Sequence, residues 1–320
     1  MTERFRFFDA LTYGIRTLFW RPVRALAFIA ALSALYAAYY LWAQSAAGIG
    51  FFAGYMQSAT QMAQGDFGSF GGYFAALMGV SMILSSVVIA GVHRVYIREA
   101  PAMRLPLQLG FDELRTLGVY ILIVLIDTGI MLLSLIPVAF LLLLLRFIPG
   151  IGDFLGAAGD PNSPAAAVGI MMIIMIPLMF FYLYVIGRLS VGLALTIRDR
   201  KFRLGGWKAS KGAGMQLFWA HLVLYLVLIG IVIVLSPNMM SVMTASMSGP
   251  EAMHDPAVMA AVANPYGALI WLAIPLQALM IFLVFGPSAA IANWDARKRA
   301  AAEAPAIGVA PGVGTGEVNA

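Results

Sequence analysis

Long apolar runs alternate with short polar segments along most of the chain. Six of these runs reach about 20 residues or more, the length that a helix needs to cross about 30 Å of hydrocarbon. The six predicted spans cover residues 22–44, 73–97, 117–145, 168–197, 215–235 and 266–294. This pattern predicts an all-α, polytopic membrane protein whose six transmembrane helices form three hairpins.

The segment before the first span has an amphipathic pattern. Residues 3–20 place Phe8, Leu11 and Ile15 on one helical face, which is typical of a helix in the headgroup region. We therefore expect cytoplasmic interfacial helices beside the spans. A cleaved signal peptide is the alternative interpretation of the first apolar run, but residues 22–44 are longer than a usual signal-peptide core.

Two further segments differ in composition from the spans. Residues 47–72 are rich in glycine, carry no Lys or Arg, and predict an external loop. The end of the chain is rich in Ala, Gly and Pro and has too little apolar surface to bury. We expect a six-helix transmembrane domain over residues 1–299 and a disordered cytoplasmic tail over residues 300–320.

Composition excludes several classes of protein. The chain is 62% hydrophobic and only 11% charged, so it has too little polar surface to cover a soluble globule. It contains no cysteine, which excludes disulfides, Cys-ligated clusters and thiol chemistry. The basic residues that give the net charge of +5 lie between the predicted spans and not on a folded soluble domain, so we expect no nucleic-acid partner.

The basic residues predict the orientation of the spans. Nineteen of the twenty Lys and Arg residues flank one side of the spans, and only Arg146 lies near the other. By the positive-inside rule both termini are cytoplasmic. The same segments would attract anionic headgroups, so membrane lipids are the expected partners. Sixteen Arg against four Lys also fits a bacterium with a GC-rich genome.

Two sequence stretches carry a resemblance to known families. These are HRVYIREAPAMRLPLQLGFDELRTLGVYIL and RLSVGLALTIRDRKFRLGGWKASKGAGMQLF. They resemble an uncharacterised family of six-helix bacterial inner-membrane proteins. The Trp- and Gly-containing segment is similar, more distantly, to the membrane domain attached to some glycerophosphodiester phosphodiesterases. The resemblance implies an inner-membrane, six-helix fold. It implies no phosphodiesterase activity, because the soluble catalytic barrel of those enzymes is missing from this sequence.

Two charged residues inside predicted spans form the sharpest candidate binding site. Asp127 lies about 15 Å into the third span, and Arg188 lies at a similar predicted depth in the fourth. Charges at such depth are usually paired or line a wet cavity. We therefore expect an intramembrane ion pair between them, with Arg94 as an alternative partner. Such a pair would serve proton- or ion-coupled transport or would lock helix packing.

Three weaker patterns concern metals, cofactors and proteolysis. The Met-rich segment 236–259 with His254 offers soft copper ligands, or one apolar face of an interfacial helix. His93 and His221 fit a bis-histidine haem or ordinary hydrogen bonds. Residues 150–153 match the GxGD string of intramembrane aspartyl proteases but lack a nearby second aspartate. We expect neither a cofactor nor a metal.

The leading functional prediction is a non-catalytic envelope or partner-binding protein of the bacterial inner membrane. It would act through its basic cytoplasmic face, and the sequence contains no G-x-S-x-G elbow, H-E-x-x-H helix, Walker A loop or G-x-G-x-x-G after a strand. The alternative is a transporter of a small solute or lipid. In that interpretation Pro137, Pro177 and Pro275 bend three helices around an outward-facing cavity, although proline is common in membrane helices.

Overall fold

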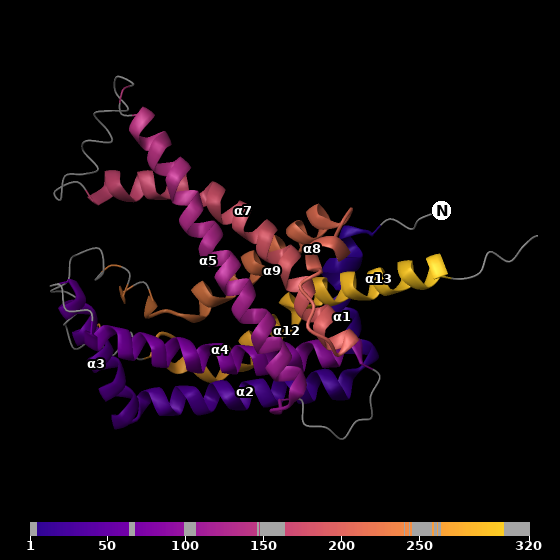
Figure 1. Cartoon of the computed structure of the whole chain (residues 1–320). Coiled ribbons are helices and arrows are strands. Elements are labelled where there is room, and N and C mark those ends of the chain that lie inside the picture. The colour runs from indigo at the N-terminus through magenta and orange to yellow at the C-terminus, as the bar shows by residue number, and fades with distance from the viewer. Residues whose placement is uncertain are drawn as a thin grey trace, which may run out of the picture.

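A computed structural model describes residues 5–63, 68–98, 107–145, 147, 164–239, 241–242, 244, 258, 261 and 264–303. Within these ranges the chain is mostly helical and contains no strand. Six helices are long and apolar enough to cross a membrane, which makes the chain a multi-pass membrane protein. Figure 1 shows these helices together with shorter ones, and α1 and α13 lie near the described ends of the chain.

The predicted spans are confirmed as helices, most of them longer than the sequence pattern indicated. The first five are α2 (Pro22–Gln44), α4 (Gly68–Ile97), α5 (Phe111–Leu145), α7 (Pro164–Asp199) and α9 (Gly214–Leu235). The sixth is the stretch Gly267–Glu303, which consists of a short 3-10 turn, η2 (Gly267–Leu269), α12 (Ile270–Val284) and α13 (Gly286–Glu303). The additional helices are α1 (Phe7–Trp20), α3 (Ala46–Ala63) and α8 (Gly206–Ala209).

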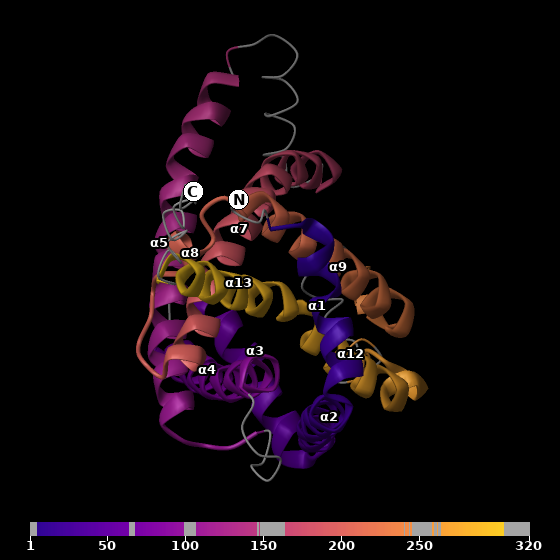
Figure 2. The same ribbon diagram turned by 90° about the vertical axis from the view of Figure 1, so that its right-hand side faces the viewer.

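The long helices form a closed arrangement. Each packs against the next one along the chain, and α12 returns to pack against α2. Figure 2 views this arrangement from the side where α1 and α13 lie across the ends of the long helices. α13 packs against α1, α4, α7 and α9, so it fills the space that these helices enclose at this end.

The buried core lies at the end of the molecule that holds α1, α8 and α13. One cluster joins these helices to α7 and α9 and is rich in alanine, which lets the backbones approach closely. A second cluster joins α2, α4, α12 and α13 around Phe28, Tyr96 and Phe282. A third, smaller cluster joins α4, α5 and α7.

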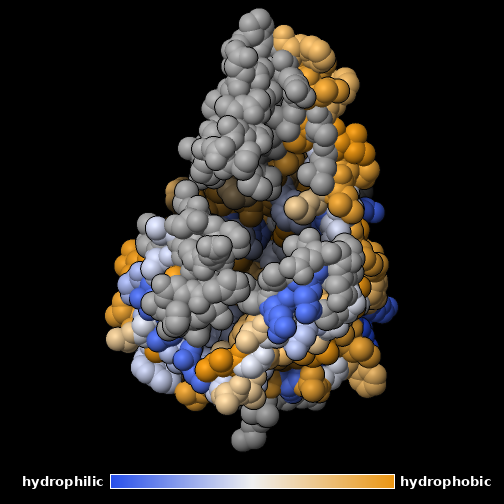
Figure 3. All heavy atoms as spheres, turned by 90° about the vertical axis from the view of Figure 1, so that its left-hand side faces the viewer, coloured by the Kyte–Doolittle hydropathy of each residue, from blue (hydrophilic) through white to orange (hydrophobic). Residues whose placement is uncertain are grey.

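The opposite halves of the long helices present their apolar side chains outwards. On α5 these include Leu125, Leu132, Leu133 and Ile136, each more than half exposed. Figure 3 views the molecule from the α3 end, and hydrophobic side chains run along its flanks while hydrophilic ones gather on the end that faces the viewer. This distribution is expected of helices whose outer faces contact lipid.

The prediction of a loop is wrong for most of residues 47–72, while their external location stays a prediction. Residues 46–63 form α3, and α4 already begins at Gly68. Phe51 packs against Trp42 of α2 and Tyr73 of α4, and Phe52 also contacts Trp42. The glycines that suggested a loop each weaken a helix by about 1 kcal/mol, and this aromatic packing compensates for them.

The sixth predicted span is two helices. α12 ends at Val284, and α13 begins at Gly286 in a new direction. Pro287 explains the break, because it has no backbone N–H to donate to a preceding turn and restricts the residue before it. The predicted tail starts at residue 300, but α13 continues to Glu303. The rest of the tail, residues 304–320, lies outside the described residues.

Candidate functional site

The connection between α7 and α9 packs back along α7. The helix ends at Asp199, Arg200 adopts a left-handed φ of 51°, and the chain then returns to form α8. A methyl group on Gly206 would lie 2.5 Å from the carbonyl oxygen of Arg188 and 2.6 Å from the nitrogen of Gly192. The absence of a side chain at Gly206 therefore allows α8 to contact the α7 backbone about three turns before that helix ends.

Arg188 is held in place by this returning segment. Its Nε donates a hydrogen bond to Ser210 Oγ at 2.9 Å, and its Nη2 donates to the carbonyl oxygen of Trp207 at 2.7 Å. Its Nη1 donates to the hydroxyl of Tyr184 at 3.1 Å, one turn earlier on α7. The guanidinium carbon also lies 3.8 Å from the centre of the Trp207 ring, which is cation–π geometry.

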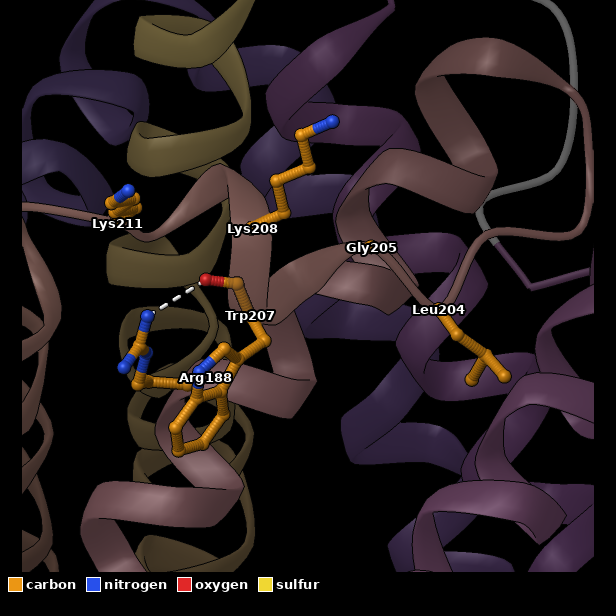
Figure 4. A pocket seen from close by; sticks show the side chains of 6 residues that line it. All are labelled: Arg188, Leu204, Gly205, Trp207, Lys208 and Lys211. Atoms are coloured by element: carbon orange, nitrogen blue, oxygen red, sulfur yellow. Dashed lines mark hydrogen bonds between the residues drawn. The ribbon is translucent and has the colours of Figure 1, made fainter.

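An open pocket lies over this arginine. It has a volume of about 620 Å³ and is lined by Arg188, Leu204, Gly205, Trp207, Lys208 and Lys211. Figure 4 shows the Trp207 indole beside the Arg188 side chain, with both lysines above them in the view. Arg188 is only 9% exposed and forms the floor, while the two lysines are exposed at the rim. No described carboxylate pairs with any of these three cations.

The expected ion pair between Asp127 and Arg188 is absent from the described residues. Asp127 Oδ2 instead accepts a hydrogen bond from the hydroxyl of Tyr182, and its buried Oδ1 has no partner in the described part of the chain. The physical reason is depth. Asp127 lies sixteen residues after the start of α5, and Tyr182 lies seventeen before the end of α7, whereas Arg188 lies only eleven before it. Arg188 also projects from a different face of α7.

Arg94, the alternative partner of Asp127, belongs to a separate set of ion pairs. It pairs with the buried Glu113 and lies 4.0 Å from Asp112, both in the first turn of α5. Arg98, just after α4, pairs with Asp112 at 2.5 Å and donates to the carbonyl oxygen of Ile197 at 2.8 Å. These contacts tie the end of α4 to the start of α5 and the end of α7.

A second set of ion pairs ties α7 to α13. Arg198 donates to Asp199 at 2.7 Å, lies 3.5 Å from Asp295, and donates to the carbonyl oxygen of Ala292. Arg299 pairs with Asp295 at 2.7 Å. The carboxylates of Asp112, Glu113, Asp199 and Asp295 are therefore all paired with arginines, so they do not neutralise the pocket.

The two histidines make ordinary hydrogen bonds. His93 is fully buried, and its Nδ1 lies 2.8 Å from the carbonyl oxygen of Ile89, which can only accept. Its Nε2 lies 3.2 Å from the hydroxyl oxygen of Ser288, which also donates a hydrogen bond to the carbonyl oxygen of Phe285 at 2.9 Å. His221 Nδ1 bonds to the carbonyl oxygen of Leu217 at 2.9 Å. Both rings thus bond to a carbonyl oxygen of their own helix, which fits the interpretation of ordinary hydrogen bonds and not that of a bis-histidine haem.

Several weaker candidates fall where little is described. Residues 150–153 and His254 lie outside the described residues, as does most of the Met-rich segment 236–259. Among the residues that are described, no group of His, Asp and Glu is arranged to hold a metal ion. Pro137, Pro177 and Pro275 lie inside α5, α7 and α12, and none of them lines the pocket over Arg188.

Sequence reasoning selected Arg188 but missed the residues that surround it. The signal that could have identified them is the string WKASK, which places Trp207, Lys208, Ser210 and Lys211 within one short turn between two spans. No protein family, curated protein or solved structure matches the chain. Function is therefore argued from the residues themselves.

Proposed function

We propose that the chain is a non-catalytic integral protein of a bacterial inner membrane, an envelope or partner-binding component. Its six spans form three hairpins, both termini are cytoplasmic, and α1 and α13 lie at the cytoplasmic interface. Its basic face contacts the anionic headgroups of the inner leaflet. The bias of nineteen of twenty basic residues to one side supports this orientation.

The observation that carries the proposal is which charged side chains at the basic end form ion pairs and which do not. Four acids there are paired with arginines that join helices, namely Asp112, Glu113, Asp199 and Asp295. Exposed cations such as Lys201, Lys208, Lys211 and Arg297 are in no ion pair within the described residues. Each would gain about 1 kcal/mol near an anionic bilayer surface.

Thiol labelling tests the orientation directly, because the chain contains no cysteine. Lys201→Cys places a thiol on the exposed connection after α7, and Gln57→Cys places one on the exposed side of α3. A membrane-impermeant maleimide added to intact spheroplasts should label Gln57→Cys. It should label Lys201→Cys only after the membrane is permeabilised. Labelling of Lys201→Cys in intact spheroplasts would contradict the proposed orientation.

Transport of a small solute or lipid is the second candidate function. The observation in its favour is the buried Asp127 Oδ1, which has no hydrogen-bond partner in the described residues. An ionisable group inside a span is often part of a proton or ion pathway. Against it, Asp127 does not line the pocket over Arg188.

Flux in proteoliposomes separates the two functions. The wild-type chain and the Asp127→Asn variant are reconstituted in parallel and assayed for pH-driven uptake of a panel of solutes. The non-catalytic proposal predicts the same background flux for both. Uptake by the wild type that Asp127→Asn abolishes would replace it with transport.

A further inference from the structure

The pocket over Arg188 has the features of an anion site and not of a structural ion pair. Arg188 is nearly buried, and its three described hydrogen bonds all go to neutral acceptors. A buried cation is normally accompanied by a carboxylate, because removing a charge from water is costly. The positive charge of Arg188 is therefore left available to a ligand.

The guanidinium is also held in a fixed orientation for binding. Its three hydrogen bonds and its stacking on Trp207 fix its plane, so a ligand need not restrict its rotation. A guanidinium carries more N–H donors than these three bonds use, and the remaining ones lie on Nη1 and Nη2. This outer edge is the one that takes two oxygens of a phosphate.

Two lysines complete the cationic lining. Lys208 and Lys211 line the pocket from the α8 segment, one helical turn apart, and both are exposed. Three cations without a carboxylate fit a ligand of more than one negative charge. A phosphate monoester meets this requirement, since it carries between one and two negative charges near neutral pH and offers three acceptor oxygens.

Apolar side chains at the same pocket indicate where the phosphate comes from. Leu204 and Trp207 line it and are 41% and 46% exposed. Both lie in a connection between two membrane helices, and Trp is typical of the membrane–water interface. An apolar rim beside a cationic floor is suited to a phosphate that is attached to acyl chains.

We infer that the Arg188–Lys208–Lys211 pocket binds the phosphate group of an anionic phospholipid, with a preference for a phosphate monoester. The inference rests on the proposed function, in which the basic face contacts anionic headgroups, and it assigns that contact to one pocket and one chemical group, a phosphate. The two rim lysines would each contact a phosphate oxygen, and the Arg188 fork would contact the others. The acyl chains would lie against Leu204 and Trp207.

Native mass spectrometry of the full chain in detergent tests this inference. The protein is titrated with phosphatidic acid, phosphatidylglycerol or phosphatidylcholine, and the bound lipid is measured. The test variant is Lys208→Gln/Lys211→Gln, which changes exposed side chains and leaves Arg188 and its contacts in place. The matched control is Lys201→Gln/Arg297→Gln, which removes the same charge from exposed positions outside the pocket.

The expected result is preferential binding of phosphatidic acid that the test variant weakens about tenfold or more, while the control changes it less than about threefold. Equal losses in both variants would overturn the pocket and leave diffuse attraction by the basic face, as the proposed function requires. Equal binding of all three lipids by the wild type would overturn both. Wild-type preference that neither variant changes would overturn the pocket alone.

A competition arm distinguishes the two sources of a phosphate. Inorganic phosphate and glycerol 3-phosphate are added at millimolar concentration to the complex with phosphatidic acid. No displacement supports the lipid as the ligand. Displacement by glycerol 3-phosphate at that concentration would assign the pocket to a soluble phosphate ester and overturn the lipid assignment.

Discussion

Gly14 in α1 and Gly286 at the start of α13 lie in backbone contact. A methyl group on Gly286 would lie 2.9 Å from the nitrogen and 3.2 Å from the Cα of Gly14. Backbone atoms cannot move aside as the end of a flexible side chain can. The crossing of α1 over the junction between α12 and α13 therefore requires glycine at this position.

We expect Gly286→Ala to destabilise the protein by about 1–3 kcal/mol, because the added methyl group separates α1 from α13. Thermal unfolding in detergent measures the loss. Gly230→Ala in α9 is the control, since nothing lies within 4 Å of a methyl group there. It should leave stability unchanged or raise it by up to about 1 kcal/mol. Equal stability of the two variants would contradict the backbone contact.

The ion pair between Arg94 and Glu113 leads to a second prediction. Glu113 is 3% exposed and pairs with Arg94, whose side chain is 13% exposed, so Glu113→Gln removes the negative charge of a largely buried ion pair, and we expect a loss of about 2–4 kcal/mol. The surface pair of Asp9 and Arg16 provides the comparison, since both side chains are about half exposed. Asp9→Asn should cost less than about 1 kcal/mol. Similar shifts in unfolding temperature for the two variants would refute the distinction.

A third prediction compares substitutions at two adjacent glycines, Gly206 and Gly205. Gly206→Ala should push α8 away from α7, lower stability by about 1–3 kcal/mol, and weaken phosphatidic acid binding. Gly205→Ala should leave stability unchanged, because nothing lies within 4 Å of its added methyl group and its φ of −70° suits alanine. Unfolding of both variants and lipid titration of Gly206→Ala check the prediction. Unchanged lipid binding by a folded Gly206→Ala variant would speak against the pocket geometry.

A fourth prediction concerns the buried contact between His93 and Ser288. Ser288→Ala removes the buried hydroxyl that lies 3.2 Å from His93 Nε2 and that donates to the carbonyl oxygen of Phe285, at a cost of about 1–3 kcal/mol. Ser134→Ala is the control, because that hydroxyl is outside the core and bonds only to a carbonyl oxygen of its own helix. Its unfolding temperature should match the wild type. No difference between the variants would mean that this hydrogen bond contributes nothing to stability.

The spans were predictable because they depend on one property, the length of uncharged apolar sequence. The first span, Pro22–Gln44, has the predicted bounds. α3 was missed because glycine at several positions favours a loop locally, while the aromatic contacts of Phe51 that outweigh it come from other helices. The break before Gly286 has a local cause in Pro287. It was missed because the apolar sequence continues through the break.

The candidate site was only partly predictable. Counting residues from the end of a span assumes that the following loop leaves the helix there, and the segment after Asp199 instead returns to Arg188. The pairing of Asp112 and Glu113 with arginines had a visible signal, because Arg94 and Arg98 lie at the end of α4 and the two acids lie in the first turn of α5, the next long helix. Tyr182 as the partner of Asp127 had none, since a tyrosine among other aromatic residues of a span is not distinctive.

From the returning segment we propose that the membrane boundary of the protein lies near Arg188. The part of α7 before Arg188 contains 24 residues, or roughly 36 Å, and α9, which begins beside Arg188, contains 22, or roughly 33 Å. Both lengths match an ordinary bilayer when they are measured from Arg188. Under this proposal the last three turns of α7, about 16 Å of helix, would stand above that boundary and pack against α13.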